Sequence, residues 1–317
     1  MIILGLRLAF DKAQFGQDVT WIGVQIRIRE LSVEATLPAD KAADLLAIII
    51  SMKRCNVISL KDLRSFAGKC ANVATVLYMW RPFLAQLWAA LTSVASHAPN
   101  GCVWRKQIDT ALAWLEAFLT LQEGTISRIF TYEASLGRAT PLEMTCDASI
   151  YGFGAWLSYQ NKPLAWFTGD DSSVDAEVLG HAAGDNTGQQ SFEAFTLLVA
   201  TRTWSHLWRS KRVRLNLRSD NMGALAVFST LKGAPGAMNL IAREYALDAA
   251  QGAYAPDVVS HLPGVTNDIA DQLSRKNDPR YAADWSPPAF LAGVPRVVLP
   301  ARPLSWWRAR IAPGSCL

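Results

Sequence analysis

The stretch Thr145–Trp156, TCDASIYGFGAW, decides the fold. It reads as a β-strand that ends near Asp147, followed by a turn and a second strand that is rich in glycine. A third strand follows it, and Asn161-Lys162 supplies the turn. We therefore predict a three-stranded meander whose strands are Leu142–Cys146, Gly152–Tyr159 and Pro163–Phe167.

Downstream of the meander, helical and strand patterns alternate. We expect a polar, acidic loop over 168–190, an amphipathic helix over Ser191–Trp208, a strand at Val213–Leu217, helices at Met222–Leu231 and 237–251, a strand at 257–261 and a helix from Asn267. We interpret the loop as a surface insertion, with repulsion of nucleic acid near a site as the alternative. The order β-β-β-α-β-α-α-β-α is typical of an α/β domain with a mixed sheet, here over residues 140–277.

Upstream of Pro141 the pattern is different. Residues 19–36 alternate as a hairpin or a pair of strands, and helices are expected at 38–52, from Ser59, at 75–96 and at 103–121. Ser59 and Asp62 resemble a capping box. From Pro287 onward, prolines and Trp306-Trp307 suggest an irregular tail or a linker. We therefore divide the chain into 1–36, a mainly helical 37–139, the α/β domain 140–277 and a tail 278–317.

Composition narrows the functional class. Of the 317 residues, 50% are hydrophobic and 18% are charged, which is ordinary for a globular protein. Residues 141–285 hold 12 Lys/Arg against 16 Asp/Glu, whereas 286–317 hold four Arg and no acid. An acidic centre between basic flanks suits a metal site whose flanks meet a polyanion, although chance variation of surface charge would look the same.

Five scattered cysteines without a CxxC pair argue against a disulfide framework and a zinc site. The apolar segment 70–97 is interrupted by Arg81-Pro82, so we expect two packed helices and no membrane partner. No secretory signal is visible. We expect an intracellular protein, nuclear or cytoplasmic, and the oligomeric state stays open.

Four carboxylates lie at strand ends or in helices of the predicted domain: Asp147, Glu193, Asp220 and Asp271. Each one alone is more often a cap, a turn residue or a solvated side chain. Together they would raise one another's pKa unless cations were present. Two Mg²⁺ ions, or alternatively Mn²⁺, would offset that repulsion, because these ions prefer oxygen ligands.

Four blocks carry a family resemblance: Thr145–Trp156 (TCDASIYGFGAW), Gln190–Phe195 (QSFEAF), Ser219–Leu225 (SDNMGAL) and His261–Arg275 (HLPGVTNDIADQLSR). They resemble the ribonuclease H domain of retroelement polymerases over about 140 residues. The spacing from His261 to Asn267 to Asp271 is the most specific part. The resemblance implies a five-stranded mixed sheet with flanking helices and cleavage of the RNA strand of RNA/DNA hybrids.

The resemblance also implies roles for single residues. Asp147 would bridge two metal ions, and Asp271 would help to hold the ion that activates water. Glu193 and Asp220 would hold the ion that stabilises the leaving 3′ oxygen, and His261 would assist proton transfer or product release.

For binding of the nucleic acid we expect Asn221, Asn267, Arg212 and Arg214. The two arginines belong to a cluster over 202–218 in which cations alternate with Trp204 and Trp208. Phosphate contacts and an ordinary core helix with a solvated edge are equally good readings of this cluster.

The first residues resemble the end of a retrotransposon reverse-transcriptase palm, with Lys12 as its late lysine and Trp21-Ile22-Gly23 as the start of a primer-grip hairpin. The helices after Pro38 then look like a thumb and connection. No Tyr-x-Asp-Asp occurs, so we expect no polymerase activity. Two alternatives remain: a catalytically silent nucleic-acid-binding remnant, and a transferase of the transposase or integrase type, which usually needs only three carboxylates.

Overall fold

The computed structural model describes residues 2–3, 6–7, 14–21, 23–92, 98–123, 125–132, 139–181, 185–209, 213–252, 258–310 and 313. Three of the residues named above, Lys12, Ile22 and Arg212, lie outside these described ranges.

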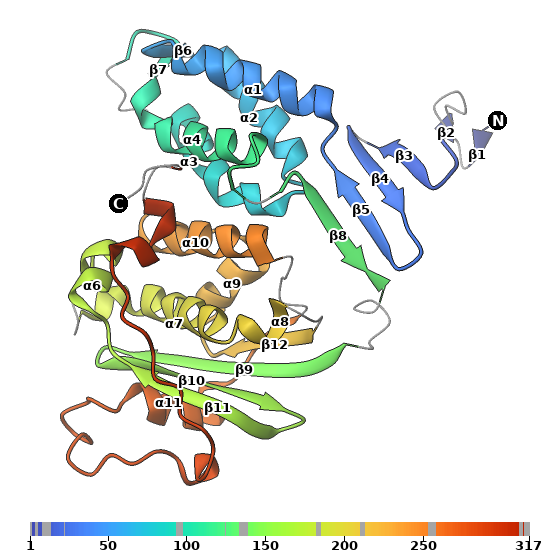
Figure 1. Ribbon diagram of the computed structural model, residues 1–317. Helices are drawn as coiled ribbons and strands as arrows, with labels where there is room; N and C mark the ends of the chain where they lie inside the picture. The colour runs from blue at the N-terminus through green and yellow to red at the C-terminus, as the bar shows by residue number, and fades with distance from the viewer. Residues whose placement is uncertain are drawn as a thin grey trace.

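A five-stranded mixed sheet forms the centre of the second half of the chain (Figure 1). β9 and β10 pair antiparallel, as do β10 and β11, while β12 pairs parallel with both β9 and β13. Parallel strands need crossover connections, which the helices supply. The predicted fold class, a five-stranded mixed sheet with flanking helices, is confirmed. The strands, in the spatial order β11-β10-β9-β12-β13, are β9 (Thr140–Ser149), β10 (Gly152–Tyr159), β11 (Lys162–Gly169), β12 (Val213–Ser219) and β13 (Val258–His261).

The turn between β10 and β11 begins one residue earlier than predicted. Tyr159 pairs with Lys162, so Gln160 and Asn161 are the two central residues, with φ angles of 49° and 60°. A two-residue turn with positive φ at both positions matches the twist of the two strands that it joins. Lys162 is therefore the first residue of β11 and not part of the turn.

Helices cover both faces of the sheet (Figure 1). α7 (Gln189–Thr203), α9 (Met222–Thr230) and α10 (Ala237–Gly252) lie on one face, and α11 (Asp268–Ser274) lies on the other. α8 (His206–Arg209) is a separate short helix after α7.

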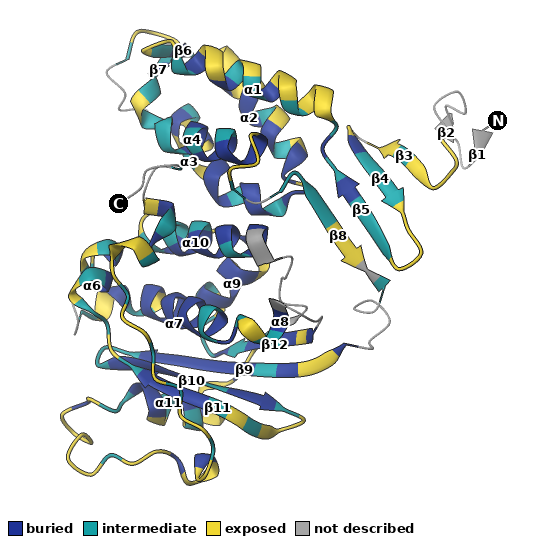
Figure 2. Ribbon diagram, in the orientation of Figure 1, coloured by how far each residue is buried: buried dark blue, intermediate teal, exposed yellow. Residues whose placement is uncertain are grey.

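α7 is not the amphipathic helix that the sequence suggested. Residues 191–201 are all buried (Figure 2). One side of the helix contacts β9 and other sides contact α9 and α10. Its hydroxyls are satisfied inside the helix: Thr196 donates to the carbonyl of Phe192 at 2.8 Å and Thr201 to that of Leu198 at 2.9 Å. A helix enclosed on every side needs no polar face.

The N-terminal region combines an antiparallel sheet with a helical cluster. Ser59 caps its second helix, since its Oγ accepts from the backbone N–H of Asp62 at 3.0 Å. The sheet has the order β3-β4-β5-β8 and consists of β3 (Asp18–Trp21), β4 (Val24–Ile28), β5 (Ser32–Thr36) and β8 (Ser127–Thr131). The helices are α1 (Ala39–Lys53), α2 (Leu60–Val73), α3 (Arg81–Thr92) and α4 (Asp109–Leu119), with the short pairs β1 (Ile2–Ile3)/β2 (Leu6–Arg7) and β6 (Val57–Ser59)/β7 (Cys102–Trp104).

One hydrophobic core runs through both regions. α3 contacts α10, and the Arg81 guanidinium donates to the carbonyl of Thr230 at 3.3 Å. The apolar segment around Arg81 is thus packed against neighbouring helices. Across the residues that the structure describes, no helix combines the length and the apolar character that a membrane crossing requires.

The acidic segment 168–190 contains a buried anchor. α6 (Ser173–Leu179) is capped by Ser172, whose Oγ accepts from the N–H of Asp175 at 3.1 Å. Asp175 is fully buried, although the sequence placed it in a surface insertion. Its carboxylate pairs with Arg302 at 2.8 Å and accepts from the indole N–H of Trp307 at 3.1 Å.

The C-terminal segment 287–310 is irregular, as expected, but it is not a free linker. Trp307 is fully buried, and its ring stacks on Phe195 of α7 with centroids 5.4 Å apart. The backbone N–H of Ala309 donates to Glu244 of α10 at 2.7 Å. Figure 1 shows this segment running from the sheet to α10. We call residues 296–310 the C-terminal strap.

Candidate metal centre and active site

Two of the predicted carboxylates meet because their strands are parallel neighbours. Arg218 of β12 pairs with Thr145 of β9, so Asp220 and Asp147, each two residues further on, lie side by side. Asp147 is 5% exposed, and Asp220 follows the last residue of β12. Adjacent parallel strands thus bring both side chains to one edge of the sheet.

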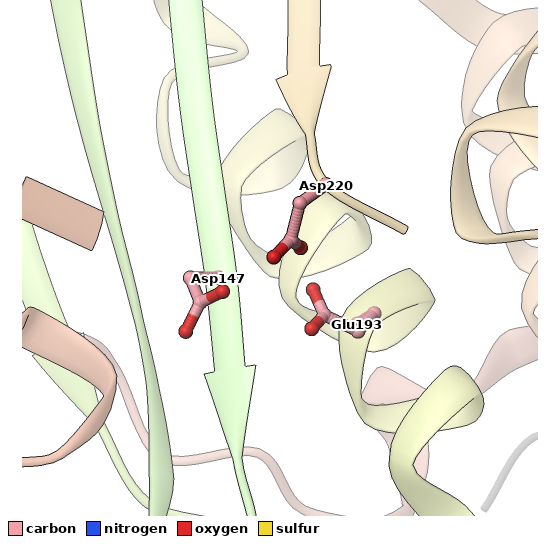
Figure 3. Close-up of side chains that lie close together, drawn as sticks. All are labelled: Asp147, Glu193 and Asp220. Atoms are coloured by element: carbon pink, nitrogen blue, oxygen red, sulfur yellow. The ribbon is translucent and has the colours of Figure 1, made fainter. Parts of the chain in front are cut away.

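The third carboxylate comes from α7. Glu193 is 4% exposed and points from the helix toward the two aspartates (Figure 3). Ligand oxygens of Asp147, Glu193 and Asp220 all lie within 4.8 Å of one another. Within the described ranges, no other group of three such side chains meets this distance.

The electrostatics of the cluster are unfavourable in the absence of cations. Burial raises the pKa of Asp147 to about 7; a hydrogen bond from Ser274 opposes this shift, and the charges of Asp220 and Asp271 add to it. Burial, followed by the charges of Asp147 and Asp220, raises the pKa of Glu193 well above its usual range. Burial and mutual repulsion thus disfavour the ionised form of both carboxyls, and a nearby cation would favour it.

Two side chains of the last sequence block hold Asp147. Asn267 is 2% exposed, and its Nδ2 donates to Asp147 Oδ1 at 3.2 Å. Ser274 donates from Oγ to Asp147 Oδ2 at 2.7 Å. Asn267 was predicted to bind nucleic acid, and the structure places its amide against this carboxylate. Ser274 was not predicted at all, although residues 267, 271 and 274 share one face of a helix by their spacing.

Asp271 lies beside the cluster but is not one of its three members. Its Oδ1 accepts from Arg275 Nη2 at 2.6 Å and from Nε at 2.8 Å, one turn further along α11. The carboxylate is 38% exposed. Its charge still acts on Asp147, as the pKa of Asp147 shows.

His261 and Asn221 flank the cluster. His261 is exposed at the end of β13, where its Nε2 lies 3.1 Å from the carbonyl oxygen of Asp220. Asn221 caps α9, because its Oδ1 accepts from the N–H of Ala224 at 3.0 Å. Both residues therefore adjoin Asp220. Asn221 is the next residue in the chain, and His261 lies at the end of the neighbouring strand β13.

In the described part of the basic cluster predicted over 202–218, three side chains are engaged inside the protein. Arg202 donates to Glu244 and Asp248 at 2.7 Å each, while Trp204 and Trp208 belong to the core. The phosphate-contact reading is wrong for these three residues.

Of the two predicted arginines, Arg214 differs from Arg202. Arg214 is exposed on β12, six residues before Asp220 and thus about 20 Å away along an extended strand. Arg212 lies outside the described residues.

The donor set fits a divalent cation that prefers oxygen. Three carboxylates converge, and burial together with the charges of neighbouring carboxylates raises the pKa values of two of them. The Oδ1 of Asn267 is buried without a hydrogen-bond partner. Carboxylate and amide oxygens are the usual ligands of Mg²⁺ and Mn²⁺. The cluster contains no sulfur or imidazole ligand of the kind that zinc favours.

Comparison with known proteins gives solved structures only. No family model matches the chain, and no curated protein matches it. The chain is similar to ribonuclease H1 of the halophilic archaeon Halobacterium salinarum NRC-1, with 13% identity and a TM-score of 0.32 over 43% of this chain and 96% of that one.

It is also similar to a foamy viral protease-reverse transcriptase. In the complex with double-stranded DNA the identity is 13% and the TM-score 0.28, over 78% of this chain and 37% of that one. In the complex with an RNA/DNA hybrid the values are 14% and 0.27, over 79% and 30%. The chain thus spans about a third of the viral protein. Identities and TM-scores this low carry no conclusion about activity, which depends on the site's own residues.

Proposed function

We propose that this chain is a metal-dependent endonuclease that cleaves the RNA strand of RNA/DNA hybrids. One observation supports it above all. Asp147, Glu193 and Asp220 converge at one edge of the mixed sheet, and burial raises the pKa values of Asp147 and Glu193. Grouped buried carboxylates are costly unless they hold cations, so a structural role alone does not account for them.

In this proposal Asp147, Glu193 and Asp220 would hold the cations. Bound divalent ions would supply charge stabilisation at the phosphate and at the leaving oxygen. Asn267 and Ser274 hold Asp147 in place. Asp271 would join the site by exchanging its pairing with Arg275, and His261, which is exposed, would carry a proton at its ring nitrogen.

The substrate class follows from the sequence blocks rather than from the fold. Selection of RNA would depend on contacts to 2′-hydroxyl groups in the minor groove. Asn221, next to Asp220 in the chain, is our candidate for such a contact, because the Asn267 amide is engaged with Asp147. We further propose that 1–36 correspond to the end of the palm with the primer-grip hairpin, and 37–139 to the thumb and connection, of a retroelement reverse transcriptase. The described strands β3, β4 and β5, followed by the helices α1 to α4, support this assignment.

The test is cleavage of an end-labelled RNA/DNA hybrid with Mg²⁺ or Mn²⁺. Asp147→Asn should lower the rate about 1000-fold or more, the equivalent of several kcal/mol of charge stabilisation. The matched control is Asp268→Asn, which changes an exposed carboxylate of the same sequence block and should cleave like the wild type.

The outcomes separate the alternatives. A folded wild-type chain that binds the hybrid but cuts nothing would refute the nuclease and leave a silent nucleic-acid-binding protein. Equal cutting of duplex DNA and hybrid would favour a transferase of the transposase or integrase type.

A further inference from the structure

Ser274 occupies an unusual position at the end of α11. It is 1% exposed, and its Oγ lies 2.7 Å from Asp147 Oδ2 and 2.9 Å from the carbonyl oxygen of Asp271. A hydroxyl has one hydrogen to donate, and a charged acceptor makes the stronger bond. The carbonyl of Asp271 does not depend on this hydrogen, because the backbone N–H of Arg275 also reaches it at 3.2 Å.

The end of α11 is fixed to the sheet by two further hydroxyls. Thr168 of β11 donates to the carbonyl of Leu273 at 2.8 Å, and Ser149 of β9 donates to that of Ser274 at 2.8 Å. These carbonyls belong to the last turn of the helix, where partners inside the helix are lacking. Two strands of the meander, β9 and β11, therefore set where the Ser274 hydroxyl lies.

A glycine in β10 lets α11 pack so closely that the helix cannot shift easily against the sheet. A Cβ on Gly154 of β10 would lie 2.3 Å from Leu273 Cβ, so the helix rests directly on the strand backbone. Closely packed elements do not shift without cost. Because the end of α11 is fixed, the Ser274 hydroxyl can fix the orientation of the Asp147 carboxylate.

We propose that Ser274 is a positioning residue of the metal centre, which fixes the second oxygen of Asp147 while Asn267 fixes the first. This inference rests on the proposed function. An ionised carboxylate offers about four lone-pair sites, so the two hydrogen bonds leave sites for cations. The orientation of the carboxylate is then set before any cation binds. Both holding groups come from α11, one from each end of the helix.

The expected loss of metal affinity can be taken from other groups that orient metal ligands. Removal of such a group typically lowers metal affinity or activity 10- to 100-fold. Ser274→Ala deletes one oxygen and places the best helix former in the last turn, so the variant should fold. Ser274→Thr keeps the hydroxyl and should restore most of the affinity. Gln272→Ala, at an exposed position of the same helix, is the matched control.

The experiment is calorimetric titration of the full chain with Mn²⁺ alone, without nucleic acid, at constant pH. We expect Ser274→Ala to weaken Mn²⁺ binding 10- to 100-fold, with the control like the wild type and the thermal midpoint within a few degrees. In cleavage assays the same variant should need correspondingly more Mg²⁺ for half-maximal rate.

Three results would count against the inference. Mn²⁺ binding by Ser274→Ala equal to the wild type would overturn it, and so would a thermal midpoint that falls in step with the affinity. If the wild type binds no Mn²⁺, both proposals fail. If it binds Mn²⁺ with the predicted variant effects but cuts no hybrid, only the proposed function fails.

Discussion

Replacing Trp307 by alanine tests whether the C-terminal strap completes the core of the α/β domain. The indole is fully buried, stacks on Phe195 at 5.4 Å between centroids and donates to the buried Asp175 at 3.1 Å. Buried Trp→Ala substitutions cost about 3–5 kcal/mol, because apolar contacts are lost and a cavity remains. For a domain of this size, that is a fall in the thermal midpoint of roughly 6–20 °C.

The assay is thermal unfolding followed by circular dichroism, with cleavage of the hybrid measured in parallel below the midpoint. Trp88→Ala is the control, since Trp88 is 43% exposed on α3 and its loss should change stability by about 0.5 kcal/mol at most. A Trp307→Ala midpoint within two degrees of the wild type would refute the claim that the strap is part of the core.

Two further predictions concern the site and its support. In the metal-free protein, Asp147 has a folded pKa of about 7, raised by burial, so its proton stabilises the fold fully below the unfolded pKa near 4, and this stability is lost as pH rises through 7. The thermal midpoint should therefore fall from pH 5 to pH 8, less steeply in Asp147→Asn and less steeply with Mn²⁺; a slope unchanged by the substitution would contradict this. Gly154→Ala should destabilise the protein by about 1–3 kcal/mol through its collision with Leu273. Gly68→Ala, in a helix with open space around it, should instead stabilise by about 0.5–1 kcal/mol in the same unfolding assay, and a Gly154→Ala variant as stable as the wild type would refute the close contact.

The sequence was informative where local pattern and tertiary structure agree. The short β-rich runs and the turn around Asp147 predicted the meander, and Ser59 with Asp62 predicted the start of α2. The convergence of Asp147 and Asp220 also follows once their strands are parallel neighbours. In the first two cases the surroundings are set by residues close in the chain, whereas the third also needs the order of strands in the sheet.

The sequence failed where distant segments decide. Asp175 looked like a solvated acid because Arg302, 127 positions later, supplies its counter-charge. Trp204 and Arg202 could be taken for a nucleic-acid surface because nothing local shows their distant partners. Phe167 of β11 packs on Trp204, and acidic residues of α10 pair with Arg202. The hydrophobic periodicity of a helix does not show how many other elements will pack around that helix.

The strap has a consequence for how this chain is made. Phe195 lies two positions after Glu193 on α7, yet the indole that it stacks on arrives more than a hundred residues later in synthesis. When all four carboxylates have been synthesised, the nascent chain still lacks the tryptophan that completes its hydrophobic core. A premature stop codon after position 275 would therefore leave every acidic ligand encoded while exposing the inner face of α7. Such a product should behave as a substrate of chaperones and proteases rather than as a shortened enzyme.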